Sequence, residues 1–503
     1  MESNNLTAEK NKLCGLVNAE TQRKTQESVG SVCMESRYGE ADMKKIREML
    51  ASGDDGRKNE AFRMLCTDKF ERYEQQYGDE IDARIERHRK GNFTVKVTDA
   101  NGKPLAGKRV RIRQTEHDFK YGANIFLLDE FAEKERNDAY RDNFHRYFNL
   151  ATVPFYWAEL EPEQGKLRFD ADSPKIYRRP APDLCVDYCR EKGILPKLHC
   201  LLYDKFLPKW VPRDDPKAMM ALYETRFAQI AERYAGKMYE FEVTNEFLDE
   251  YRWGNSCSAL CGERDVLRWA YEQARKYFPN ETLVLNEGPR IPEIALHDYR
   301  SYYFMMVDAL LSKGASIDKL GVQNHIFCGA RGPQEEVIFQ FLQHYDPQML
   351  MRGWGYLGEF GKPMEVTEVT VPTFGESDEA EQLQADVLCE LYRLWFSIPG
   401  METIVYWNTV EGTAYVKPDG SANENNVRGG LFHNDCSPKR AAKAMRDLFQ
   451  KVWHTDAEGV TDGNGCVTLR GFYGDYEGDV EGRPFAFGIH QKTANSKTVA
   501  MTE

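Results

Sequence analysis

Residues 239 to 246 are Tyr239-Glu240-Phe241-Glu242-Val243-Thr244-Asn245-Glu246. Apolar and polar side chains alternate along this stretch, as they do in a half-buried β-strand, and the stretch ends in an Asn-Glu pair. A second strand-like run, residues 363–369, carries Glu368 near its end. Because reactive side chains gather where the strands of a parallel barrel end, these two glutamates predict one rim of such a barrel.

The chain between these runs and around them alternates between strand-like and helix-like patterns. The strands are predicted at 121–125, 150–156, 196–202, 239–244, 282–286, 320–325, 364–368 and 403–407. The helices are predicted at 134–147, 181–192, 216–235, 264–277, 298–313, 334–345, 378–397 and 438–452. We therefore expect an α/β fold, a (β/α)8 TIM barrel, over residues 119–454.

The segments outside the barrel predict three further parts. Residues 1–38 are polar and unpatterned, which predicts a disordered tail, and residues 39–90 form a helical lead-in. Alternating segments in 91–118 and 455–503 predict a small accessory β-sandwich-like module built from both ends of the chain. A loop at 252–263, which contains Trp253, is predicted to be an insertion close to Glu246.

Composition narrows the class of protein. The net charge of −13 argues against a nucleic-acid-binding protein, for which a basic surface patch is expected. No apolar run is long enough to span a membrane. We expect no metal site, because the cysteine pairs spaced four residues apart are not joined by histidines at zinc-site spacing. The polar N-terminus predicts a cytoplasmic protein if the sequence is native and complete, and a secreted one if a signal peptide has been removed.

Glycoside hydrolysis requires two carboxyl groups, and one rim of a barrel can provide both. One group must stay protonated to assist the leaving oxygen, and the other must be ionised beside the anomeric carbon. A glutamate at a strand end is, by itself, more often a solvated residue, so the surrounding motifs decide the interpretation.

Four motifs in the same order resemble those of glycoside hydrolase family 10, the retaining endo-β-1,4-xylanases. They are Thr244-Asn245-Glu246, Gly321-Val322-Gln323-Asn324-His325, Val366-Thr367-Glu368, and residues 430–435 followed by Ser437-Pro438-Lys439. The resemblance extends from about residue 85 to residue 476. It implies cleavage of β-1,4-xylosidic bonds in xylan or xylo-oligosaccharides by double displacement, with a carbohydrate as the partner and no cofactor.

The resemblance also implies residue roles. Glu246 matches the general acid and base, and Glu368 matches the nucleophile. The residues that match or replace the family's substrate-binding positions are Asn245, His199, Gln323, His325, Trp407, Tyr203, Tyr156, Glu411 and Tyr415. A buried histidine at a strand end is more often structural than catalytic, and Trp407 could simply close the barrel.

Several positions depart from the family pattern. Polar ligands of the upstream sugars are replaced by Thr152, Val153 and Tyr156, and Asp204 replaces a histidine. The aspartate that usually follows the nucleophile by two residues, and supports the neighbouring histidine, is Thr370. A hydroxyl that loses its partner costs about 1–3 kcal/mol, so plain xylan is expected to bind less well.

Three alternatives to an ordinary xylanase therefore stay open. The first is a β-glycosidase with changed specificity, for a decorated oligosaccharide or a small glycoside with an apolar aglycone. The second is a carbohydrate-binding relative without turnover, although two retained carboxylates argue against it. The third is a barrel enzyme of unrelated chemistry, such as a metal-dependent lyase or an aldolase, for which no supporting cluster is visible in the sequence.

Overall fold

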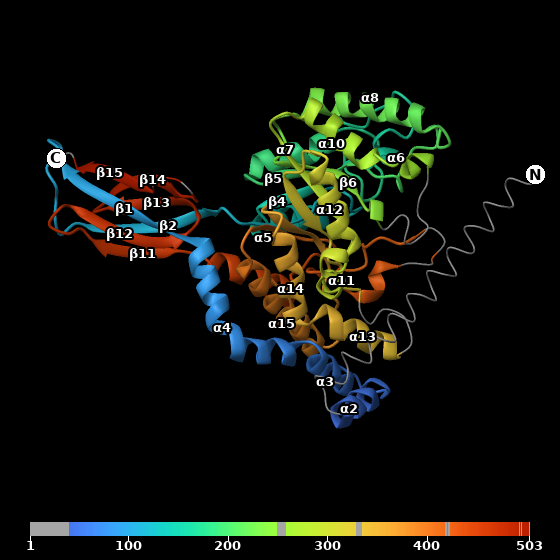
Figure 1. Cartoon of the computed structure of the whole chain (residues 1–503). Coiled ribbons are helices and arrows are strands. Elements are labelled where there is room, and N and C mark those ends of the chain that lie inside the picture. Colours follow the sequence, from blue (N-terminus) through green and yellow to red (C-terminus); the bar gives the residue numbers. More distant parts are fainter. Residues whose placement is uncertain are drawn as a thin grey trace, which may run out of the picture.

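The computed structural model describes residues 40–248, 258–327, 334–417, 420, 423–491, 493 and 495–501. The predicted tail, 1–38, lies outside the described residues, and so does Trp253 of the predicted insertion. Figure 1 shows two bodies: a helix-rich barrel, and a β module that is formed by the blue and red ends of the chain.

Eight parallel strands close into the barrel, in the order β10-β3-β4-β5-β6-β7-β8-β9. They are β3 (Lys120–Asn124), β4 (Leu150–Pro154), β5 (Leu195–Leu202), β6 (Glu240–Asn245), β7 (Thr282–Glu287), β8 (Lys319–Val322), β9 (Met364–Val369) and β10 (Met401–Tyr406). The strands are buried almost throughout, as expected for a parallel sheet that is covered by helices. The predicted (β/α)8 barrel is confirmed.

Helices cover the outside of the barrel (Figure 1). They are α5 (Lys134–Tyr147), α6 (Trp157–Leu160), α7 (Pro182–Lys192), α8 (Pro216–Tyr234), α10 (Val266–Tyr277), α11 (Ile291–His297), α12 (Tyr302–Ser312), α13 (Gln334–His344), α14 (Pro347–Gly358), α15 (Asp378–Ser397) and α16 (Arg440–Asp447). Short helical turns are η1 (Ala259–Gly262), η2 (Asp298–Arg300), η3 (Glu424–Val427) and η4 (Leu448–Val452). No helix of the described residues is long and apolar enough to cross a membrane.

Two sheets form the β module. The strands are β1 (Lys90–Asp99), β2 (Arg109–His117), β11 (Asp456–Val460), β12 (Cys466–Phe472), β13 (Gly474–Val480), β14 (Arg483–Ile489) and β15 (Ser496–Met501). One sheet has the order β12-β1-β15, and the other has the order β11-β2-β13-β14. Their inward side chains, including Phe93, Val110 and Tyr476, form an apolar core separate from that of the barrel.

Three helices precede the module: α2 (Glu40–Leu50), α3 (Asp55–Leu65) and α4 (Thr67–Arg89). In Figure 1 they run from the module along the barrel. Arg89, at the end of α4, is buried and donates hydrogen bonds to the carbonyl oxygens of Phe396 (2.6 Å) and Ile398 (2.8 Å). The lead-in is therefore anchored to the barrel by charge-assisted hydrogen bonds as well as by apolar packing.

Candidate active site

The two predicted carboxyl groups lie at the carboxyl ends of strands β6 and β9. Glu246 directly follows β6, and its backbone has a φ of 58°, in the left-handed region that side chains other than glycine seldom adopt. Glu368 lies within β9, and only 3% of it is exposed. Such backbone strain is concentrated at functional sites, where the surrounding structure fixes one side-chain direction.

Two amide side chains connect these carboxyl groups. Gln323 Nε2 donates to Glu246 Oε1 at 3.0 Å and to Asn245 Oδ1 at 3.2 Å. Asn286 Nδ2 donates to Glu368 Oε1 and to Asn245 Oδ1, both at 2.9 Å. The two glutamates therefore belong to one hydrogen-bonded set, with Asn245 between them. Asn286 ends a predicted strand, but no motif had marked it as part of the site.

The second carboxylate oxygen of Glu368, Oε2, lies beside the ring of His325. His325 Nε2 lies 3.1 Å from Glu368 Oε2, and His325 Nδ1 lies 3.3 Å from Thr370 Oγ1. Burial lowers the pKa of His325, and it raises the pKa of Glu368 to about 8. The surroundings of Glu368 therefore stabilise its ionised form poorly.

Glu246 has a more polar neighbourhood. The hydroxyl of Tyr203 donates to Glu246 Oε2, and Lys205 Nζ lies 3.8 Å from the same oxygen. Its other oxygen accepts the bond from Gln323. Glu246 and Glu368 therefore differ in their surroundings, which is the condition for two carboxyl groups to take different roles.

A second histidine is held by a buried carboxylate. His199 Nδ1 is bonded to Glu242 Oε2, and His199 Nε2 lies 2.9 Å from the hydroxyl of Tyr156. Burial would lower the pKa of His199, but the adjacent Glu242 outweighs it and raises this pKa. His199 therefore carries a positive charge more readily than His325 does.

Glu242 in turn joins a charge cluster inside the barrel. Lys197 Nζ lies 2.7 Å from Glu242 Oε1, 2.5 Å from Glu365 Oε1 and 3.5 Å from Glu240 Oε1. Lys319 Nζ lies 2.7 Å from Glu240 Oε2. These side chains are at most 3% exposed, so each charge depends on its partners. The cluster fixes Glu242, and through it His199, beneath the pocket.

Donor atoms of His199, Glu242 and Glu368 lie within 4.8 Å of one another, a spacing that could hold a metal ion. Both nitrogens of His199 are, however, already bonded, one to Glu242 and one to Tyr156. The geometry is that of a hydrogen-bonded chain that ends beside Glu368.

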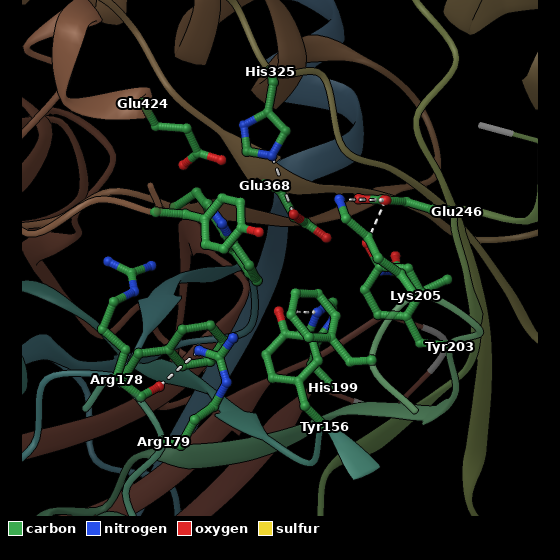
Figure 2. A pocket seen from close by; sticks show the side chains of 15 residues that line it. Tyr156, Arg178, Arg179, His199, Tyr203, Lys205, Glu246, His325, Glu368 and Glu424 are labelled. Carbon is green, nitrogen blue, oxygen red and sulfur yellow. Dashed lines mark hydrogen bonds and ion pairs between the residues drawn. The ribbon is translucent and has the colours of Figure 1, made fainter. Parts of the chain in front are cut away.

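A pocket opens over these groups (Figure 2). Its lining consists of Phe126, Tyr156, Arg178, Arg179, His199, Tyr203, Lys205, Phe206, Asn245, Glu246, His325, Glu368, Trp407, Tyr415 and Glu424. Most of the residues predicted from the sequence thus come together here. Gln323 reaches the site by its bonds to Glu246 and Asn245.

Two further carboxylates are Glu411, a predicted substrate-binding residue, and Asp204, one of the departures from the family pattern. Glu411 lies outside this lining; it accepts hydrogen bonds from Lys439 Nζ (2.8 Å) and from the backbone N–H of Gly430 (3.2 Å). Asp204 is fully buried and accepts hydrogen bonds from the backbone N–H (2.7 Å) and the hydroxyl (2.5 Å) of Ser258. Both carboxylates hold loops near the pocket.

Six further residues line the pocket without having been predicted from the sequence: Phe126, Arg178, Arg179, Lys205, Phe206 and Glu424. Lys205 and Phe206 closely follow the predicted strand that carries His199, so their place after a strand end was a usable signal. Arg178 and Arg179 come from a long irregular segment between α6 and α7, where no periodicity predicts a direction.

Comparison with known sequences assigns the family. The model of one family, described as Glycosyl hydrolase family 10, matches residues 115–448, which include the whole barrel from β3 to β10. The chain belongs to glycosyl hydrolase family 10. The family-10 match ends within the last barrel helices, so the lead-in helices and most of the β module lie outside it.

Curated relatives of this family-10 chain are distant. The anti-sigma-I factor RsgI6 of Acetivibrio thermocellus is 26% identical over 409 residues, which are 80% of this chain and 46% of that protein. Endo-1,4-beta-xylanase 2 of Arabidopsis thaliana is 24% identical over 402 residues, 78% of this chain and 32% of that protein. The chain therefore spans less than half the length of both relatives.

Solved structures share the fold. Native xylanase 10B from Thermotoga maritima aligns with a TM-score of 0.52 at 19% identity, covering 67% of this chain and 96% of that one. Xylanase 10B from Thermotoga petrophila RKU-1, in complex with xylobiose, aligns with a TM-score of 0.51 at 18% identity, covering 67% and 95%. At 18–19% identity, these similarities show the fold of the barrel alone.

Proposed function

We propose that this family-10 chain is a retaining β-glycosidase that cleaves β-1,4-xylosidic bonds in xylan or xylo-oligosaccharides. The observation that carries the proposal is the hydrogen-bonded set in which Asn245, Asn286 and Gln323 join Glu246 to Glu368. Xylose-based chains are proposed as the substrate because a curated relative is an endo-1,4-beta-xylanase and a structural neighbour is a xylanase in complex with xylobiose.

The reaction would proceed in two displacements. In the first, a Glu368 oxygen attacks the anomeric carbon, the bond from that carbon to the leaving oxygen breaks, and Glu246 gives its proton to the leaving oxygen. In the second, Glu246 takes a proton from water, the water oxygen attacks the anomeric carbon, and the bond to Glu368 breaks. The anomeric configuration is retained after the two inversions.

The raised pKa of Glu368 fits this role once substrate is present. A buried anion that the protein stabilises poorly is stabilised by the positive charge that develops on the sugar in an oxocarbenium-like transition state. Asn286 and His325 fix its two oxygens at 2.9 and 3.1 Å, so that the carboxylate is held in one orientation.

A second candidate, a β-glycosidase with altered specificity, is favoured by the upstream wall of the pocket. Thr152 and Val153 are 1% and 0% exposed and lie within β4, so neither can replace a polar sugar ligand. Tyr156 reaches the pocket, but its hydroxyl is bonded to His199. Plain xylan would lose hydrogen bonds on this side, at about 1–3 kcal/mol for each unpaired group.

Product analysis on xylan, xylo-oligosaccharides, other β-glycans and aryl β-glycosides tests both candidates, with the Glu246→Ala and Glu368→Gln variants as controls. Short xylo-oligosaccharides that form with a β anomer first, as observed by proton NMR, support the leading proposal. Cleavage of only small or decorated glycosides supports the second candidate. Carbohydrate binding without turnover of any substrate, or near-normal turnover by Glu368→Gln, contradicts the proposed mechanism.

A further inference from the structure

Two consecutive arginines form one side of the pocket. Arg178 and Arg179 reach it from the segment between α6 and α7, whereas Glu246, Tyr203 and Lys205 lie on the opposite side, with Glu368 between the two groups (Figure 2). The general acid stands beside the leaving group, so the arginine side faces the sugar that Glu368 attacks.

Aromatic rings surround the guanidinium of Arg179 at the wall of the pocket. Its guanidinium carbon lies 4.1 Å from the centre of the Tyr156 ring and 5.5 and 5.6 Å from the rings of Phe126 and Phe206. The side chain is 11% exposed. Three aromatic rings therefore hold the planar guanidinium in one orientation while leaving it at the pocket wall.

The carboxylate that faces Arg179 does not satisfy it. Glu159 Oε2 lies 3.8 Å from Arg179 Nε, beyond hydrogen-bonding distance, and neither atom has a hydrogen-bond partner among the residues that the structure describes. Arg179 Nη1 donates to the carbonyl oxygen of its neighbour, Arg178, at 2.9 Å. Arg179 is therefore held by one backbone carbonyl and by an ion pair with Glu159 that is too long for a hydrogen bond, so its guanidinium is incompletely hydrogen-bonded.

Arg178 adds a second charge at the same wall. It is 8% exposed, it donates one hydrogen bond to the carbonyl oxygen of Thr413, and its backbone φ is 62°. Burial, and then the charge of Arg179, lower the pKa of Arg178, while Glu424 partly opposes them. Two cations that repel each other in a buried pocket wall are stabilised by an anion between them.

We propose that Arg178 and Arg179 bind the carboxylate of a uronic acid unit on the glycone side of the cleaved bond. The proposal rests on the function proposed above and names its substrate class: an acidic β-glycan or acidic oligosaccharide in place of plain xylan. A guanidinium fork matches the two oxygens of a carboxylate. A singly charged group is preferred to a phosphate, because Glu246, Glu368 and Glu424 share the pocket and would repel a second negative charge.

The test compares two substrates that differ only in the carboxylate. Glucuronic-acid-substituted xylo-oligosaccharides are first reduced with borohydride, so that every sample carries the same alditol end. One part is used in this form, and the other is used after carbodiimide activation and a second borohydride reduction, which turns each carboxylate into a neutral primary alcohol. We expect kcat/KM for the acidic substrate to be about ten- to a hundredfold higher, as for a charged hydrogen-bonded pair. Raising the salt concentration from about 0.05 to 0.5 M should reduce this ratio.

Variants then locate the charge. Arg179→Gln should bring the ratio close to one, and Arg179→Lys should retain part of it, because the charge remains while the fork is lost. The matched control is Arg352→Gln, which removes one arginine from the exposed face of α14 and should leave the ratio unchanged. Thermal unfolding of each variant shows whether the fold is retained. The kcat/KM ratio of the wild type tests the proposal even if a variant fails to fold.

Three results overturn the inference: equal kcat/KM for the two substrates in the wild type, a preference that survives in Arg179→Gln, or a preference equally reduced in Arg352→Gln. If the wild type cleaves neither substrate, the proposed function fails, and isothermal titration calorimetry with the same two oligosaccharides still measures the carboxylate preference. The two failures are thereby distinguished.

Discussion

Replacing Thr370 with aspartate should change the pH at which the nucleophile becomes active. His325 Nδ1 lies 3.3 Å from the Thr370 hydroxyl, and burial keeps the pKa of His325 low. An aspartate at position 370 would place a carboxylate beside Nδ1, which favours the imidazolium form and turns Nε2 into a charged donor to Glu368.

The size of the effect follows from the 3.1 Å between His325 Nε2 and Glu368 Oε2. At an effective dielectric constant of about 20, two unit charges at this separation attract by about 5 kcal/mol. Part of this energy is lost in charging a buried imidazole, so we expect the pKa of Glu368 to fall by about 2 units, equivalent to about 3 kcal/mol. From its value of about 8, the pKa would reach about 6.

The assay is the pH dependence of kcat/KM on the best substrate from the panel, because this ratio reports ionisations of the free enzyme. At pH 6 the ionised fraction of Glu368 should rise from about 1% to about 50%, so Thr370→Asp should be about fiftyfold more active there, with no gain above about pH 9. Thr370→Asn, which adds no charge, is the control. A folded Thr370→Asp protein whose acidic limb stays at the wild-type pH would refute the reasoning.

Three further predictions concern Glu246, His117 and Lys197. Glu246→Ala should lose activity by about a hundredfold or more on natural glycosides but much less on aryl glycosides with good leaving groups, which need no proton; equal losses in steady-state assays would contradict the acid role. Burial lowers the pKa of His117 to about 3, so its stabilising contribution is complete above the unfolded value of about 6.5 and is lost as pH falls toward 3. We therefore expect the free energy of unfolding, measured by urea titration, to fall between pH 7 and pH 5 by about 2 kcal/mol less in His117→Gln than in the wild type. An equal fall in the two proteins would exclude this linkage. Lys197→Met leaves three buried glutamates without their shared cation and should lower the free energy of unfolding by about 3–5 kcal/mol, whereas Lys44→Met on the surface of α2 should change it by less than about 0.5.

The sequence predicts the barrel well because its strands and helices differ in period. The predicted strands coincide with β3 to β10 to within a few residues. The pattern fails at α11 and α14, which are unpredicted. Helix α14 contains Gly353, Gly355 and Gly358, which weaken a helical prediction, yet at Gly353 a β-carbon would lie 2.5 Å from the carbonyl oxygen of Ile291 in α11. Close packing between two helices outweighs local preference there.

The site is predictable where it follows a strand end and unpredictable where it follows a loop. Glu246, Glu368 and His199 are placed by β6, β9 and β5, so their convergence follows from the barrel. Arg178 and Arg179 lie 24 and 25 residues beyond the end of β4. Their directions depend on tertiary contacts: Arg178 donates to the carbonyl oxygen of Thr413, and Arg179 packs against the rings of Tyr156, Phe126 and Phe206. Long-range contacts of this kind leave no periodic signal in a sequence.

The β module can assemble only after the C-terminal strands of the chain have been synthesised. Strand β1 pairs in parallel with β15, Thr94 beside Ser496, and its other neighbour is β12. A ribosome therefore releases all eight barrel strands before β1 meets either partner, and domains generally fold as units during synthesis. We expect the barrel to form first, with β1 and β2 exposed as open edges until the last strands emerge. Chaperone dependence during translation should accordingly arise from the module.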